Sequence, residues 1–231
     1  MPDMSRPSRF GERRAELARR MQRGIAVIPT APERMRNRDS DYLYRFDSYF
    51  YYLTGFTEPG SVLILIAGQE SPGTAKSILF CRDKDPEREI WEGFRHGPDG
   101  AKAQFGLDEA YSIAALNDLM PKLLAGQQAL HYAPGADADW DARIMGWLNR
   151  VREQARAGIA APTEIHDVRK MLDEMRLRKD GDELATMRQA AGISAAAHLK
   201  AMQATRPGRM EFEIEAELLY EFRRRGAQYP A

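Results

Sequence analysis

The stretch "VLILIA", Val62 to Ala67, is a run of six apolar residues without polar alternation. A short run of this kind between turn-forming residues is typical of a β-strand that is covered on both faces. Three further runs predict strands for the same reason: "IAVI" from Ile25, "SILFC" from Ser77 and "ALHY" from Ala129. Helical patterns lie between these runs. The alternation of strands and helices predicts an α/β domain, which we assign to residues 1–162.

The helical patterns carry their own start and stop signals. "DADWDARIMGWLNRVREQA" places two tryptophans and four other apolar residues on one stripe, with Asp137 or Asp139 available as N-cap. "SIAALNDLMPKLLAG" is also helical, but Pro121 costs about 3 kcal/mol in an unbroken helix, so we expect a kink or two shorter pieces. Helical spacing near the N-terminus predicts an opening helix that packs on the core through Phe10, Leu17, Ala18 and Met21.

The segment "RAGIAAPTEIHD" loses this periodicity and contains Gly158 and Pro162, as domain boundaries often do. We therefore assign residues 163–231 to a second domain. Its patterns are helical, and Asp180 with Glu183 predicts a capping box at the start of a long helix. No predicted strand comes after these helices to cover their apolar stripes, so we expect the second domain to be cut short.

The composition excludes several classes of function. The 34 basic and 34 acidic side chains cancel, so the charge gives no indication of nucleic-acid binding. The longest apolar run is far shorter than the roughly 20 residues that span a bilayer, which predicts a soluble protein without membrane contact. Cys81 is the only cysteine, so no intrachain disulfide can form and a reducing compartment, the cytoplasm, is expected.

Common catalytic motifs are missing from the sequence. The four histidines are each more than thirty residues apart, so no local metal-binding pair exists. We expect His131, in an apolar strand, and His198, beside an apolar helical stripe, to be structural. There is no phosphate-binding glycine loop and no G-x-S-x-G motif. Arg82 and Lys84 follow Cys81 and would lower its pKa, but a buried structural thiol is the favoured interpretation.

An aromatic stretch is not explained by packing alone. "RNRDSDYLYRFDSYFYYLTGF", Arg36 to Phe56, holds eight of the chain's eighteen Phe and Tyr residues among several charges. The alternation of residues 42, 44 and 46 predicts a strand edge, and Asp47 is a candidate cap for a short helix that ends at Leu53. Tyrosine buries a ring and keeps a hydroxyl to pair, so this cluster suits an interface between domains or subunits.

A second stretch, "REIWEGFRHG" from Arg88 to Gly97, places Trp91 and Phe94 between charges. Two interpretations fit equally well. The loop folds back and buries the rings, or it presents them to a peptide or a partner subunit.

Taken in order, these stretches resemble aminopeptidase P, the Xaa-Pro aminopeptidase of the pita-bread metallopeptidases. The similarity runs through "RNRDSDYLYRFDSYFYYLTGFTEPGSVLILI", "REIWEGFRHG", "DEMRLRKDGDELATMRQAAGISAAAHLKAM" and "RPGRMEFEIEAELLYEFRRRGAQYP". It covers essentially the whole chain. Prolidase and creatinase share the architecture, but the charged "RNRDSDY" before "YYLTGFTEP" is similar to aminopeptidase P rather than to either.

The resemblance implies a creatinase-like N-terminal α/β domain followed by the truncated start of an α+β pita-bread domain. It implies an enzyme that releases the N-terminal residue of peptides with proline in second position. The family uses two metal ions, usually manganese, held by two aspartates, one histidine and two glutamates. These ligands lie after the "GAQYP" equivalent, so we assign no catalytic residue and no metal ligand here. We expect the 231 residues alone to bind no metal and to be inactive.

In this family the N-terminal domain is thought to mediate contacts within a homo-oligomer and to wall the entrance to the active site. On that basis Asp39, Trp91 and Arg156 match positions that face substrate or a neighbouring subunit. Each has a structural alternative: Asp39 caps a turn, Trp91 belongs to the core, and Arg156 is a solvated charge. Trp91 is the candidate that we favour.

Two hypotheses for the function remain. In the first, the chain is the N-terminal portion of an Xaa-Pro aminopeptidase, serves oligomerisation and active-site access, and leaves catalysis to residues beyond it. In the second, it is a stand-alone, non-catalytic creatinase-like module that binds or scaffolds. The codons after residue 231 in the gene separate the two. The amphipathic helices between Asp180 and Arg225 favour the enzyme, because a free-standing module has little reason to keep an uncovered apolar stripe.

Overall fold

The computed structural model describes residues 9–68 and 75–228 and divides the chain into two compact units, Met1–Met175 and Arg176–Ala231. The division lies later than residue 162, where the sequence placed the boundary. The reason is that strand β8 (Glu164–Asp167) pairs with β7 (Ala129–Tyr132), and helix α7 (Arg169–Leu177) buries Leu172 in the core of the first unit.

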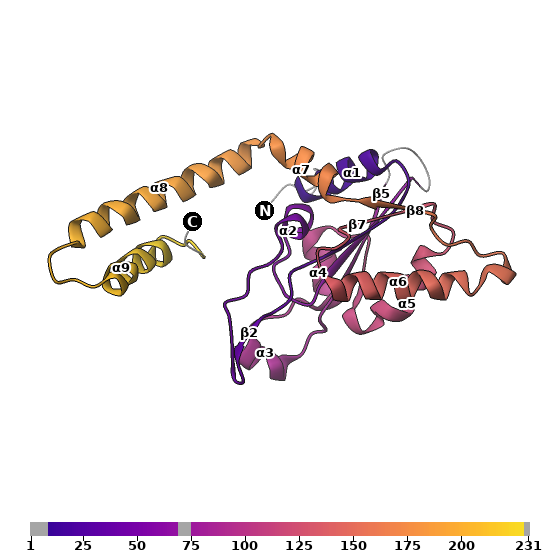
Figure 1. The fold of residues 1–231 in the computed structure, drawn as a ribbon, viewed down its shortest axis with the longest axis horizontal. Coiled ribbons are helices and arrows are strands. Elements are labelled where there is room, and N and C mark those ends of the chain that lie inside the picture. The colour runs from indigo at the N-terminus through magenta and orange to yellow at the C-terminus, as the bar shows by residue number, and fades with distance from the viewer. Residues whose placement is uncertain (1–8, 69–74, 229–231) are drawn as a thin grey trace. The chain divides into compact units, whose positions relative to one another are not determined.

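The first unit is built on a six-stranded mixed sheet (Figure 1). Its strand order is β6-β5-β4-β1-β7-β8. Strands β1 (Gly24–Pro29), β4 (Val62–Ala67) and β5 (Ala75–Cys81) pair antiparallel, whereas β6 (Glu109–Ser112), β7 and β8 each run parallel to their neighbours. The four strands predicted from apolar runs are all present, and the α/β class is confirmed. Strands β6 and β8 of this sheet were not predicted from the sequence.

Strand β4 is buried along its whole length because both faces of the sheet are covered. Leu63 and Leu65 point into one core, whereas Ile64 and Ile66 point into the other. This explains why the strand is apolar without alternation.

Helices cover the two faces separately. One core receives side chains from α1 (Arg9–Met21), α2 (Ser48–Thr54), α4 (Gly97–Phe105) and α7. The other core receives α5 (Leu116–Leu124) and α6 (Ala138–Arg152), which contact each other. A hairpin of β2 (Met35–Asn37) and β3 (Ser40–Asp41), the helix α3 (Pro86–Glu92) and two 3-10 turns, η1 (Ile113–Ala115) and η2 (Ala155–Ala157), complete the unit.

The predicted helical stretch consists of two pieces, the turn η1 and helix α5, but the division lies before Leu116 and α5 runs through Pro121, so the break expected at the proline is absent. Proline has no N–H, so the carbonyl of Asn117 loses its helical donor. Arg150 of α6 replaces that donor, with its Nη1 2.7 Å from the Asn117 oxygen. Trp147 donates its indole N–H to the Asn117 side chain at 3.2 Å. The contact between α5 and α6 thus compensates the backbone defect.

The expected caps are present, but one expected strand is not. Asp137 accepts from the amides of Asp139 and Trp140, and Asp47 accepts from those of Tyr49 and Phe50. By contrast, residues 42–47 form no strand, so the strand edge predicted there from alternating rings is wrong. The Tyr44 ring turns inward instead, and its hydroxyl lies 2.8 Å from the Thr30 hydroxyl.

The second unit contains α8 (Gly181–Ala204) and α9 (Glu211–Arg224), which pack through Ile193, Ala197 and Phe222. The predicted capping box is present, with the Glu183 amide 2.8 Å from Asp180 and the Asp180 amide 3.0 Å from Glu183. Several apolar residues on these helices remain exposed, namely Leu184, Met187, Leu199, Met202 and Phe212.

Among residues 9–68 and 75–228, no helix combines the length and the apolar character needed to cross a membrane.

Candidate functional site

Helix α3 presents large apolar side chains to solvent. Asp85 caps the helix by accepting from the Arg88 amide, and Pro86 occupies its first turn. Trp91 is 88% exposed, and Ile90 and Phe94 are also exposed. The structure therefore places Trp91 outside the core, and of the two interpretations of "REIWEGFRHG" it agrees with the one in which the rings are presented outward.

A buried carboxylate holds the end of this segment in place. Glu58 is only 7% exposed. Its Oε1 accepts from the His96 backbone amide at 2.7 Å and lies 2.5 Å from the His96 ring Nδ1. Its Oε2 lies 3.6 Å from a guanidinium nitrogen of Arg82. Since a buried charge needs a partner, these contacts fix where the chain leaves the exposed helix.

Lys84 forms a second anchor for the same segment. Its Nζ donates to the Arg95 carbonyl at 2.9 Å, pairs with Glu89 at 2.9 Å and lies 3.9 Å from the centre of the Phe94 ring. The hydrogen bond from Lys84 lowers the pKa of Glu89. Together with Glu58, the lysine makes the α3–α4 connection a fixed support for the exposed rings. No local sequence pattern marks either residue for this role.

The other two predicted site residues lie on separate elements. Asp39 is exposed in the turn between β2 and β3, where its backbone amide donates to the Asn37 side chain at 3.1 Å. Arg156 is exposed in η2. In the described part of the chain, no hydrogen bond or ion pair joins any two of Asp39, Trp91 and Arg156. The structure does not assemble them into one site within the first unit.

The aromatic stretch from Arg36 to Phe56 contains both buried and exposed side chains. Phe50, Tyr52 and Phe56 are buried in the core of the first unit, and the Tyr52 hydroxyl donates to the Met175 carbonyl at 3.3 Å. Tyr42 and Leu43 are exposed next to the hairpin. Much of the stretch thus serves internal packing, and its outward part is limited to the hairpin side.

Two further candidates from the sequence, Cys81 and His131, are structural. Cys81 is buried, and burial, with Glu58 and Asp83 nearby, raises its pKa to about 12. His131 is 2% exposed, with Nε2 3.2 Å from the Arg23 carbonyl and its ring stacked on His166. Burial lowers the pKa of His131 and keeps it neutral. Neither the Cys81 thiol nor the His131 imidazole is therefore suited to catalysis.

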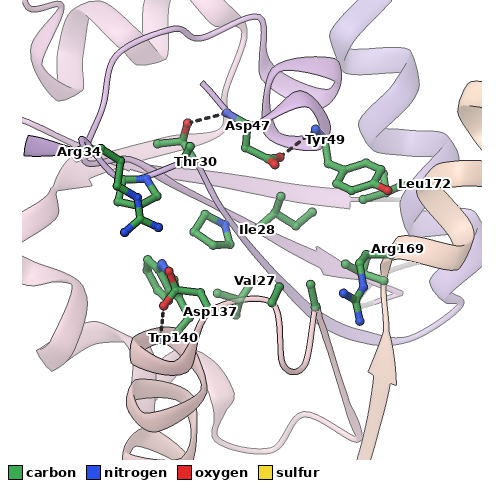
Figure 2. A pocket seen from close by; sticks show the side chains of 16 residues that line it. Val27, Ile28, Thr30, Arg34, Asp47, Tyr49, Asp137, Trp140, Arg169 and Leu172 are labelled. Atoms are coloured by element: carbon green, nitrogen blue, oxygen red, sulfur yellow. Dashed lines mark hydrogen bonds between the residues drawn. The ribbon is translucent and has the colours of Figure 1, made fainter. Parts of the chain in front are cut away.

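A cavity of about 270 Å³ opens where three parallel strands end (Figure 2). Its floor is apolar and includes Val27, Ile28 and Leu172. Four charged residues also line it, namely Arg34, Asp47, Asp137 and Arg169. In Figure 2, Arg34 and Asp137 lie on one side of the pocket and Arg169 on the other. No sequence motif marks this pocket, because its walls come from distant segments.

No metal centre is found in the part of the chain that the structure describes. Within residues 9–68 and 75–228, no group of three or more His, Cys, Asp and Glu side chains is placed to hold a metal ion. These described residues do not fit a catalytic metal site.

Comparison with known proteins first defines the class. The family model for the aminopeptidase P N-terminal domain matches residues 10–132, and the model for metallopeptidase family M24 matches residues 185–231. The chain thus joins an N-terminal α/β domain to a segment of a metallopeptidase domain. It belongs to the aminopeptidase P family, as the sequence predicted.

Individual relatives agree with this assignment. The Xaa-Pro aminopeptidase of Escherichia coli is 40% identical over 100% of this chain and 52% of its own length. The structure of Pseudomonas aeruginosa aminopeptidase PepP superposes with a TM-score of 0.91 at 45% identity, covering 96% of this chain and 50% of that one. Zinc-substituted Escherichia coli aminopeptidase P in complex with product gives a TM-score of 0.92 at 38% identity, covering 98% and 51%. The chain spans about half the length of the relatives it matches.

Proposed function

We propose that this chain is the N-terminal portion of an Xaa-Pro aminopeptidase, which releases the first residue of peptides with proline in second position. The observation that carries the proposal is the order of the two matched domains together with 40% identity to an Xaa-Pro aminopeptidase along the whole chain. Metal chemistry, with manganese as the expected ion, would be supplied by segments of the family that come after these residues. A cytoplasmic location remains part of the proposal, supported by the single buried thiol.

The first unit would contact neighbouring subunits and would control the access of substrate to the active site. The exposed Trp91 supports this role, because a large ring held away from its own core on a fixed support is typical of interface hot spots. Asp39 and Arg156 are proposed for the same role, and their exposure leaves both side chains available to substrate or to a second subunit of a homo-oligomer.

The exposed apolar side chains of α8 and α9 favour the enzyme over a stand-alone binding module. Met187, Leu199 and Met202 are more than half exposed, which is costly for a free domain and natural for helices that a further layer covers.

Peptidase assays on a longer chain, extended with the codons after residue 231, test the proposal. We expect cleavage of an Xaa-Pro-Xaa peptide with added manganese, and a lower kcat/KM for Trp91→Ala. Glu87→Ala, on the same helix and also exposed, is the matched control and should keep full activity. Equal activity of Trp91→Ala and the parent would contradict the role assigned to the tryptophan. If a folded, metal-loaded longer chain cleaved no peptide, the proposal that it is an Xaa-Pro aminopeptidase would be contradicted.

A further inference from the structure

The cavity of Figure 2 lies at a position where α/β sheets commonly bind ligands, and its lining combines apolar and charged side chains. Strands β1, β7 and β8 are parallel neighbours, and the pocket lies where the chain leaves all three. In open α/β sheets, ligands bind in the crevice outside the carboxyl ends of such strands. The position of the cavity is independent of the proposed peptidase activity.

Arg34, a positive group on the pocket wall, is exposed and has no charged partner among the residues that the structure describes. Arg34 makes no ion pair and no side-chain hydrogen bond with any residue in the described part of the chain. Arg169, on the other side, is already occupied, since it pairs with Asp167 and donates to the Pro134 carbonyl at 3.1 Å. An unpaired guanidinium beside an apolar floor is suited to bind a carboxylate of a ligand.

Two aspartates that line the cavity, Asp47 and Asp137, each have one carboxylate oxygen that caps a helix and one that does not. The Oδ1 atoms of Asp47 and Asp137 each accept two backbone amides at the start of a helix. Neither Oδ2 atom accepts a hydrogen bond from any described residue. Helical capping fixes both side chains and leaves one oxygen of each to receive N–H donors. No ion pair joins these aspartates to Arg34 within the described residues, although all three line one cavity.

The size of the cavity limits the ligand. Its volume of about 270 Å³ lies just below the roughly 300–1,000 Å³ typical of pockets for drug-sized molecules. A ligand with a carboxylate, an ammonium and a compact apolar body satisfies the charges, the floor and the volume together. We propose that this pocket binds a free α-amino acid with an aliphatic side chain.

The indole N–H signals of the tryptophans provide a local readout. Trp140 lines the pocket, whereas Trp91 does not. In ¹⁵N-labelled 231-residue protein, L-leucine should shift the Trp140 indole signal saturably and leave the Trp91 signal unchanged. L-leucinamide lacks the carboxylate and 4-methylpentanoate lacks the ammonium, so each should bind roughly tenfold more weakly or worse, given what a charge-assisted hydrogen bond contributes.

Variants separate the pocket from general effects. Arg34→Gln should weaken leucine binding at least tenfold, as expected for loss of a charge-assisted contact. Arg36→Gln removes an exposed arginine two residues away that does not line the cavity, so its affinity should equal that of the parent. No saturable Trp140 shift with leucine would overturn the proposal. Equal affinity for leucine and 4-methylpentanoate, or equal affinity of Arg34→Gln and the parent, would overturn the recognition of a zwitterion by these charges.

Discussion

Removal of the Glu58 carboxylate should destabilise the first unit strongly, because this charge is buried and multiply bonded. Glu58→Ala removes an acceptor with contacts at 2.7 and 2.5 Å to His96 and leaves Arg82 facing an empty site. Breaking a buried charge pair costs about 3–5 kcal/mol. The side chains of His96 and Arg82 are 18% and 16% exposed, so water can partly replace the lost contact. We therefore expect about 3 kcal/mol, the lower end of that range.

The measurement is unfolding by urea, followed by tryptophan fluorescence. All three tryptophans, Trp91, Trp140 and Trp147, belong to the first unit, so the signal reports that unit alone. In thermal unfolding of the same variant, a loss of about 3 kcal/mol should lower the melting temperature of a domain this size by roughly 6–12 °C. Glu58→Gln keeps the shape and one acceptor oxygen, so its loss should be smaller. Glu87→Ala, an exposed carboxylate on α3, should change stability by less than about 0.5 kcal/mol. If Glu58→Ala matched Glu87→Ala, the anchoring role of Glu58 would be refuted.

Three further predictions concern other parts of the molecule. Cys81, with its pKa raised to about 12, should resist iodoacetamide at pH 8 in the folded protein and react once urea unfolds it; rapid labelling of the native protein would contradict its burial. Burial lowers the pKa of His131, so unfolding takes up a proton and the free energy of unfolding should fall as pH drops through about 6.5, the ordinary histidine value. His131→Gln should remove that part of the slope, and identical slopes would refute the assignment. Asp180→Ala should cost helix α8 about 1 kcal/mol and speed exchange of the Glu183 amide; unchanged exchange would show that the cap contributes nothing.

The sheet and its two cores could be predicted largely from local patterns. Strand β4 is apolar throughout because Leu63 and Ile64 enter different cores, so the run itself carried the information. The caps at Asp47, Asp137 and Asp180 were readable because capping depends on residues two or three positions apart. Strands β6 and β8 escaped prediction because "EAYS" and "EIHD" are short, half polar and exposed in part.

The exposure of Trp91 could not be decided from the sequence, since a ring between charges fits both a buried loop and a presented one. The structural reason for the exposed position lies far away in the chain, at Glu58, which binds His96 across 38 residues. The same limit applies to the pocket, where Arg34, Asp47 and Asp137 line one cavity although they come from separate segments of the chain. Local spacing carries no signal for such contacts.

The most direct test of the proposed identity compares two purified chains in one assay. The 231-residue chain and the chain extended past residue 231 are each shown to be folded by circular dichroism and incubated with manganese and an Xaa-Pro-Xaa peptide. We predict release of the first amino acid by the extended chain and none by the 231 residues. Cleavage by the 231 residues alone would contradict the placement of the metal ligands in later segments.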